Sequence, residues 1–224
     1  MEKRKNKIIV ISCLAIITLI GATFAAFRGS SQTKENVSTS ALGITLLRNG
    51  EDIESNTAYN QGEYKGLPGE TVNEKISVKA KKGEGYNPVY VRVTAYRYWT
   101  KEGTKVSQTE NGETLNVEEI VINTPNKEQD WIFEEDPEDP EVVYMYYKKQ
   151  LEPGGNKDKA DFMESYTILG ESTDSNKYLK HQAVIEFEAN AVQTTLAKEA
   201  MLAEWGVEAV FDGTGNLISA EHQK

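Results

Sequence analysis

Cysteine and histidine are almost absent from this sequence. Its 224 residues contain one cysteine, Cys13, and two histidines, His181 and His222. A disulfide framework, a multi-cysteine zinc site and an iron–sulfur cluster all need more of these side chains. Neither histidine belongs to an H-E-x-x-H motif, and the sequence has no G-x-S-x-G turn. These absences predict that the protein is not an enzyme, and they make a secreted protease the least favoured function.

Positive charge is also scarce. The chain has 25 Lys and Arg against 35 Asp and Glu, a formal net charge of −10. An acidic surface repels phosphate backbones, and no basic stripe interleaved with aromatic residues offsets that repulsion. The sequence therefore predicts no nucleic-acid partner. A strongly negative chain is well suited to solubility outside the cell.

Long apolar runs are missing except at the N-terminus. There, a basic start is followed by the run Ile8–Ile20, which only Ser12, Cys13 and Thr18 interrupt, and then by small residues. This three-part layout is typical of a secretory signal peptide, so residues 1–25 are predicted to be a leader.

The predicted cleavage site lies between Ala25 and Ala26. Thr23 and Ala25 supply the small side chains that a signal peptidase accepts at the −3 and −1 positions. The alternative is an uncleaved anchor, because the apolar segment up to Phe27 is about long enough to span ~30 Å of hydrocarbon. Cleavage would remove four basic side chains and Glu2, which leaves 21 basic and 34 acidic side chains and a net charge of −13. We expect the protein to contact the membrane only through its leader.

Residues 26–40 are polar and rich in Ser and Thr. Their only apolar side chains are Ala26, Phe27 and Val37. Such a segment has too little apolar surface for a helix or core strand of its own, so we expect a flexible N-terminal arm.

From residue 41 the sequence alternates with a period of two, as half-buried strands do. In Thr71–Ala80 only Glu74 breaks an apolar face, and Val89–Tyr98 carries valines on one side and tyrosines on the other. Gly, Pro and Asn turns separate the runs. About seven strands of this kind predict an all-β protein, an antiparallel β-sandwich over residues 41–211. The remaining candidate strands are residues 42–47, 115–122, 142–149, 165–169 and 183–192.

The segment Thr194–Trp205 has a different pattern. It is rich in helix formers, spaces Ala197, Met201 and Trp205 four residues apart, and is followed by Gly206. This pattern predicts one short helix packed over an end of the sandwich. An edge strand over Val207–Phe211 is expected after it, and then a C-terminal tail over residues 212–224 that begins with a turn at Asp212–Asn216 and ends frayed.

Two features can be read as ligand sites or as ordinary structure. Six carboxylates between residues 134 and 141 form a loop that would suit a weak calcium site, although the D-x-D-x-D-G spacing is absent and such loops are usually only solvated. Eight aromatic residues could stack on sugars, but cross-strand pairing on a half-buried sheet explains them without any ligand and is the favoured interpretation. These residues are Tyr90, Tyr96, Tyr98, Trp99, Trp131, Tyr144, Tyr146 and Tyr147.

Several motifs occur together in one order. The junction after the leader reads GATFAAF. It is followed, in this order, by the segments LPGETVNEKISVKAKKGEGYNPVYVRV, YYKKQLEPGG and IEFEANAVQTTLAKEAMLAEWG. In this set, spanning residues 21–206, the chain resembles the TasA/camelysin family of exported bacterial surface and biofilm-matrix proteins. It departs from the family pattern in a long insert between Trp99 and Asp130 and in a more polar arm.

The resemblance implies a sandwich of jelly-roll type and export to the cell surface or biofilm matrix. A dedicated signal peptidase would process the leader. It also implies that the protein self-assembles into fibres or associates with related exported proteins. In such fibres each subunit donates an N-terminal strand to the next subunit. Phe27 and Val37 are then the expected contacts of the arm. The alternative is a monomeric surface module that binds a glycan or a host protein.

Overall fold

The computed structural model describes part of the chain, namely residues 43–53, 58–60, 69–83, 85–106, 109–110, 113–169 and 181–223. The predicted leader and arm, with Ala25, Ala26, Phe27 and Val37, lie outside these residues. In the described part, no helix has both the length and the apolar character needed to cross a membrane.

One sheet of the fold, sheet A, has five antiparallel strands in the order β2-β1-β4-β12-β9. Its central strand β4 begins and ends where the alternating pattern predicted. The strands are β1 (Ile44–Arg48), β2 (Glu51–Ile53), β4 (Thr71–Ala80), β9 (Ile120–Asn123) and β12 (Lys159–Ile168).

The second sheet, sheet B, has the order β10-β11-β5-β13-β3 and is antiparallel throughout. Its strands are β3 (Ala58–Asn60), β5 (Val89–Lys101), β10 (Trp131–Glu135), β11 (Val142–Tyr147) and β13 (Gln182–Gln193). The short strand β6 (Thr104–Lys105) pairs with the end of β5. The connection from sheet B to β9 and then to β10 contains β7 (Thr109–Glu110), β8 (Glu113–Thr114), η1 (Val117–Glu119) and α2 (Lys127–Asp130).

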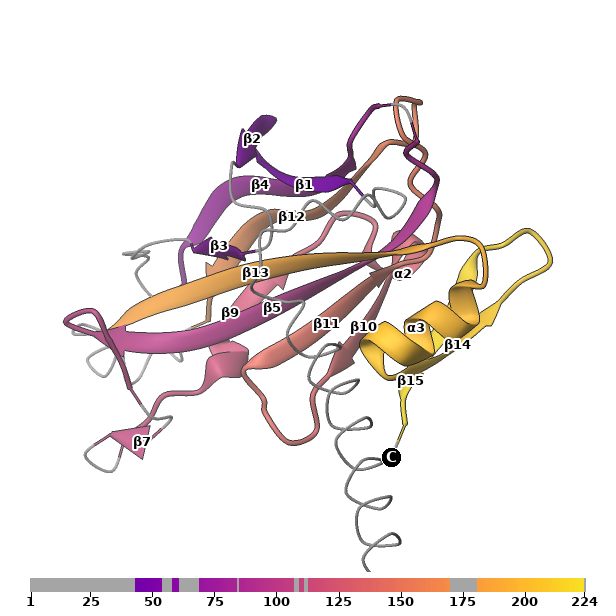
Figure 1. The fold of residues 1–224 in the computed structure, drawn as a ribbon. Helices are drawn as coiled ribbons and strands as arrows, with labels where there is room; N and C mark the ends of the chain where they lie inside the picture. The colour runs from indigo at the N-terminus through magenta and orange to yellow at the C-terminus, as the bar shows by residue number, and fades with distance from the viewer. Residues whose placement is uncertain are drawn as a thin grey trace, which may run out of the picture. The chain divides into compact units, whose positions relative to one another are not determined.

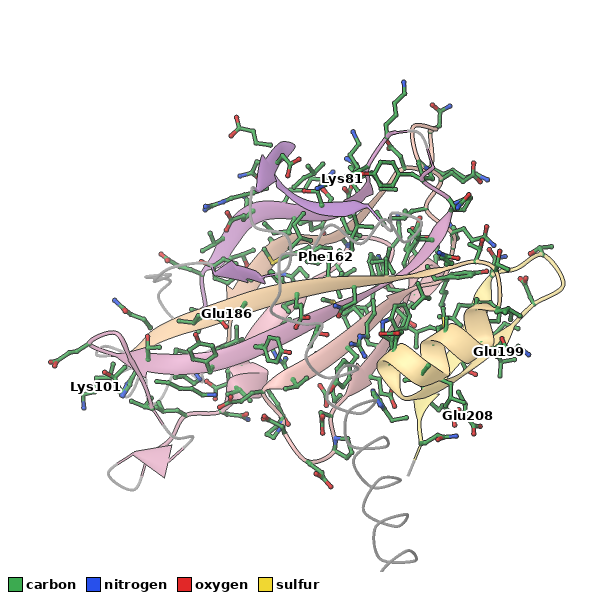
Figure 2. All side chains as sticks on the ribbon, in the orientation of Figure 1. Lys81, Lys101, Phe162, Glu186, Glu199 and Glu208 are labelled. Carbon is green, nitrogen blue, oxygen red and sulfur yellow. The ribbon has the colours of Figure 1, made fainter. Side chains whose placement is uncertain are left out.

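The two sheets pack face to face over the main hydrophobic core. Phe162 of β12 and Phe187 of β13 meet across the sandwich with their ring centroids 5.0 Å apart, and Trp131 contacts Phe162 from the edge of sheet B. Figure 2 labels Phe162 between the sheets. The predicted all-β, antiparallel sandwich is confirmed, because each sheet buries the apolar face that its alternation defined.

Glu74, which broke the alternation of β4, lies on the buried face of that strand and is 4% exposed. Arg48 of β1 pairs with its carboxylate. A buried carboxylate is costly unless it is paired, so the departure from the pattern is explained by this neighbour on the adjacent strand.

The C-terminal residues form a module of α3 (Ala197–Trp205), β14 (Val207–Phe211) and β15 (Leu217–His222). The predicted helical stripe is correct, since Ala197, Met201 and Trp205 are its buried residues. The helix starts three residues later than expected because Leu196 has a left-handed backbone, with φ 54°. It ends at Gly206, whose N–H bonds the carbonyls of Met201 and Leu202.

The predicted turn over Asp212–Asn216 is confirmed, but the expectation of a frayed tail after it is wrong. Strand β15 pairs antiparallel with β14, and the turn between them is held by the carboxylate of Asp212. Hydrogen bonds from Asn216 and Thr214 lower the pKa of this carboxyl. The predicted strand over residues 115–122 also proved shorter, because η1 occupies its first half and only β9 is extended.

Candidate functional site

The outward face of sheet B is divided into a covered half and an open half. The C-terminal module lies over the end of the sheet where β5 begins, as the yellow elements of Figure 1 show. It buries a second hydrophobic cluster that includes Tyr90, Tyr146, Val192, Met201 and Trp205. The sheet therefore has apolar packing on both faces at this end, and alternation along its strands is lost there.

Hydrogen bonds fix the module to the sheet. The Tyr90 hydroxyl donates to the Gly215 carbonyl at 2.5 Å and accepts from the Gln150 amide at 2.9 Å. The Leu217 N–H donates to the Lys148 carbonyl at 2.7 Å. The module is thus joined to β5, to the end of β11 and to the loop after it.

Arg92 marks the boundary between the two halves. Its guanidinium carbon lies 5.4 Å from the Tyr144 ring centroid and 5.3 Å from that of Trp205. Its terminal nitrogens approach the Trp205 carbonyl and the Asn190 side chain. Arg92 therefore stacks between an aromatic of the sheet and one of the module.

His222, which stood near the terminus in the sequence, is part of this contact. Its ring packs on Tyr144 with centroids 4.7 Å apart, and its Nε2 lies 3.3 Å from the Tyr146 hydroxyl. Its backbone N–H donates to Glu134, and Nε2 lies 3.7 Å from the other carboxylate oxygen. The residue thus joins β15 to the edge of sheet B, and these contacts describe a docking role.

The open half carries half-buried tyrosines bonded to carboxylates of the neighbouring strand. Tyr98 donates to Glu186 at 2.9 Å and Tyr96 to Glu188 at 3.4 Å. Burial, and then the bond to Glu186, raises the pKa of Tyr98 to about 12. Burial and Glu188 raise the pKa of Tyr96 in the same way. Both hydroxyls are held as neutral donors, which fixes the rings on the sheet surface.

The structure separates the eight aromatics that sequence analysis grouped as one stacking platform. Trp99 and Trp131 are buried in the main core, and Tyr147 packs against it. Tyr90 and Tyr146 are buried under the module. Only Tyr96, Tyr98 and Tyr144 remain half-buried on the outward face. A platform of eight residues is therefore wrong, and at most three can meet a ligand.

The carboxylates of residues 134–141 point to separate partners. Asp136 accepts backbone N–H bonds from Glu138 and Asp139, which lower its pKa, and Glu141 pairs with Lys105. Among the described residues, which include this whole loop, no three His, Cys, Asp or Glu side chains gather in a way that could hold a metal ion.

Within the described part of the chain, strand β13 has a stretch at the edge of sheet B that no strand pairs with, and we call it the open stretch. In the described part of the chain, β3 pairs only with its residues 186–188. No described strand is therefore paired with Ala189–Val192 on that side. Alternate N–H and C=O groups of such a stretch are directed away from the sheet, where another strand can bond to them.

A groove of about 490 Å³ runs between this stretch and α3. Its apolar lining comes from Ala191 and Val192 of β13 and from Leu196 and Ala200 beside them. Ala191 faces the inside of the sandwich and Val192 the outside, so the groove reaches over the strand edge. Glu199, which Figure 2 labels on α3, and Glu204 complete the rim with Gln193 and Thr195.

Leu196 stands out in this groove on two counts. Its side chain is 70% exposed, the most exposed large apolar side chain among the described residues. Its φ of 54° places a branched residue in the left-handed region, which costs about 1–2 kcal/mol relative to ordinary helical backbone. Strain of this size is commonly found at functional sites. The sequence pattern predicts Leu196 only as part of the helix over Thr194–Trp205.

The arm that was expected to meet such an edge, with Phe27 and Val37, lies outside the described residues. Comparison with known family models, with curated proteins and with solved structures finds no match for this chain. The features of this chain that bear on its function are therefore its sequence motifs, its fold and the open stretch of β13.

Proposed function

We propose that this chain is an exported bacterial structural protein of the cell surface or biofilm matrix. In this proposal, each copy donates its N-terminal arm as a strand to sheet B of the next copy. Export is supported by the predicted leader and by the motifs that, in their order along the sequence, resemble the TasA/camelysin family. The single observation that supports assembly most strongly is the open stretch Ala189–Val192 beside an apolar groove.

Strand addition suits this edge for a physical reason. An incoming extended segment satisfies backbone groups of β13 and places alternate side chains toward the groove. Donor and acceptor occupy different parts of the same chain, so the contact is head to tail and propagates into an open array. Phe27 and Val37 are the apolar side chains of the arm that can fill the groove beside Leu196.

Deletion of residues 26–40 tests the proposal. The chain that begins at Ala26 is expected to form polymers visible by electron microscopy and light scattering, while the chain that begins at Ala41 stays monomeric with the same circular dichroism. Polymers formed equally by the shortened chain would refute strand donation.

Leu196→Gly tests the acceptor. Glycine adopts the left-handed backbone without strain, so this variant is expected to be more stable than the parent by about 1 kcal/mol. It also removes the most exposed side chain of the groove, so polymerisation is expected to weaken. Stability and assembly then change in opposite directions, which a general folding defect cannot produce. The control is Ile218→Gly, which removes an exposed side chain from β15, away from the groove.

The second candidate function is a surface module that binds a glycan or a host protein. The observation that favours it is the open half of the outward face, where Tyr96 and Tyr98 are fixed by carboxylates that can also accept hydrogen bonds from sugar hydroxyls. A glycan array with the parent and with Tyr96→Ala tests it. Saturable binding by a monomer that Tyr96→Ala abolishes would favour this function over assembly.

A further inference from the structure

A second cavity lies at the side of the sandwich where both sheets end, between β9 of sheet A and β10 and β11 of sheet B. Its volume is about 360 Å³. The apolar lining consists of Val121, Ile122, Phe133 and Val143, and Ile122 and Phe133 pack against the main core. The cavity is thus a mixed apolar and charged opening into the sandwich, separate from the β13 groove.

Arg97 of β5 lines this cavity from the inward face of its sheet, and its side chain is 9% exposed. Two of its terminal nitrogens donate to backbone carbonyls, NH1 to Ile120 at 3.3 Å and NH2 to Pro140 at 3.2 Å. Its Nε–H is buried and has no hydrogen-bond partner among the residues that the structure describes. The guanidinium is therefore held in place from two sides while part of its donor set is unused.

The charge of Arg97 is poorly balanced. The nearest carboxylate oxygen, from Glu135, lies 3.9 Å away on a side chain that is 67% exposed, and Glu118 at the rim is exposed too. Burial lowers the pKa of Arg97, and these two carboxylates offset that effect only in part. Buried charges in proteins are normally paired with a close counter-ion. The Arg97 guanidinium is therefore available to pair with a negatively charged ligand.

Lys127 of α2 adds a second cation at the opening. Its Nζ lies 4.1 Å from the centroid of the Phe133 ring, which is itself part of the apolar wall. Arg97 and Lys127 place two cationic side chains beside the apolar wall, while the carboxylates of Glu118 and Glu135 also line the cavity but are exposed. The buried charge of the cavity, that of Arg97, is therefore positive, which favours a negatively charged group on an apolar stem.

We propose that this cavity binds a small organic anion, a carboxylate carried on an apolar group. The carboxylate meets the Arg97 guanidinium where it lines the cavity, and charge-assisted bonds are strong there because the guanidinium is already desolvated and fixed. The apolar group lies against Ile122, Phe133 and Val143. This site is independent of the proposed assembly, since it uses neither the arm nor the groove beside β13.

Titration with hexanoate tests the site, with the chain that begins at Ala26 observed by ¹H–¹⁵N correlation spectra. We expect saturable shifts of the Phe133 and Lys127 amides and of the Arg97 Nε–H, in the millimolar range suited to so small a ligand. Hexanol and hexylamine have the same chain without the carboxylate and are expected to bind at least about tenfold more weakly. Equal binding of hexanol would overturn the proposal, because the cavity would then be only an apolar space.

Variants at the rim separate the site from the fold. Glu135→Gln removes the carboxylate that competes for Arg97 and is expected to tighten hexanoate binding by about two- to fivefold. The matched control is Glu128→Gln on α2, an exposed change of the same charge that does not line the cavity. Arg97→Met is expected to abolish binding. Unchanged affinity in Glu135→Gln would contradict the proposal even if Arg97→Met failed to fold.

The source of the carboxylate is distinguished by two peptides. A short peptide that ends in leucine with a free carboxylate is compared with the same peptide ending in an amide. If the peptide with the free carboxylate binds and hexanoate does not, the site is assigned to chain termini. If hexanoate binds and the peptide does not, the site is assigned to small free acids. Binding of neither probe overturns the proposal.

Discussion

Two halves of one sheet surface differ in what covers them. On the outward face of sheet B, Tyr90 and Tyr146 are buried under the C-terminal module, whereas Tyr96 and Tyr98 are half-buried and bonded to glutamates. Tyr90, Tyr96 and Tyr98 lie on the same strand, β5, and on the same face of it. Whether a tyrosine on this face is part of a core or of the surface therefore depends on the C-terminal module, which lies far later in the chain.

The largest expected difference between the halves is in stability. Trp205 is 5% exposed and packs on Tyr146 and Arg92, so Trp205→Ala is expected to lower the free energy of unfolding by about 3–5 kcal/mol. Tyr98→Ala removes only cross-strand contacts and is expected to cost about 1 kcal/mol. Urea denaturation measures both values. Similar losses in the two variants would show that the module is not a second core.

A smaller effect is expected at the joint between helix and hairpin. Gly206 has φ 69°, and a Cβ there would meet no atom within 4 Å. Gly206→Ala is therefore expected to cost about 1–2 kcal/mol through the backbone alone. Gly213→Ala in the β14–β15 turn is the matched control, because that site is equally open and its φ is not positive. Thermal unfolding that shows equal losses for both would contradict this account of the cap.

The smallest effect concerns the open half at high pH. The pKa of Tyr98 is about 12 in the folded chain against an ordinary value of 10.0, so the folded state holds this proton more tightly. The stability that Tyr98 contributes is thus fully present below pH 10 and is lost as the pH rises through about 12. Tyrosinate absorbance of the parent minus that of Tyr98→Phe measures this titration.

Glu186→Gln sharpens the same point. It removes the negative charge that disfavours tyrosinate, so the pKa of Tyr98 is expected to move down toward its ordinary value. The control is Glu164→Gln, which removes an exposed carboxylate from β12 of the other sheet. A Tyr98 titration that is the same in both variants would mean that Glu186 does not contact it in solution.

The local sequence pattern was enough to predict the long strands and the helix. The strands β4, β5 and β13 follow the predicted alternation because each buries one face in the main core, and α3 buries the stripe that its spacing indicated. In contrast, β10 was missed. It has three apolar residues and two glutamates, is followed by an aspartate and a proline, and is stabilised by pairing with β11 rather than by its own pattern.

Long-range contacts account for what the sequence could not show. Strand β15 has little alternation, and its position depends on pairing with β14 and docking on sheet B. The covered tyrosines depend on the same docking. The left-handed backbone of Leu196 also has no sequence signal, because no glycine or asparagine marks it. The open groove was therefore found only from the structure.

Cross-linking between copies tests the proposed assembly most directly. A chain that begins at Ala26 contains no cysteine, so Val37→Cys in one copy and Leu196→Cys in another supply the only thiols. Oxidation of the mixture is expected to give dimers of one copy of each. Ile218→Cys, exposed on β15, is the control that is expected to give few. Absence of the Val37–Leu196 disulfide, or equal yield with Ile218→Cys, would contradict strand donation into this groove.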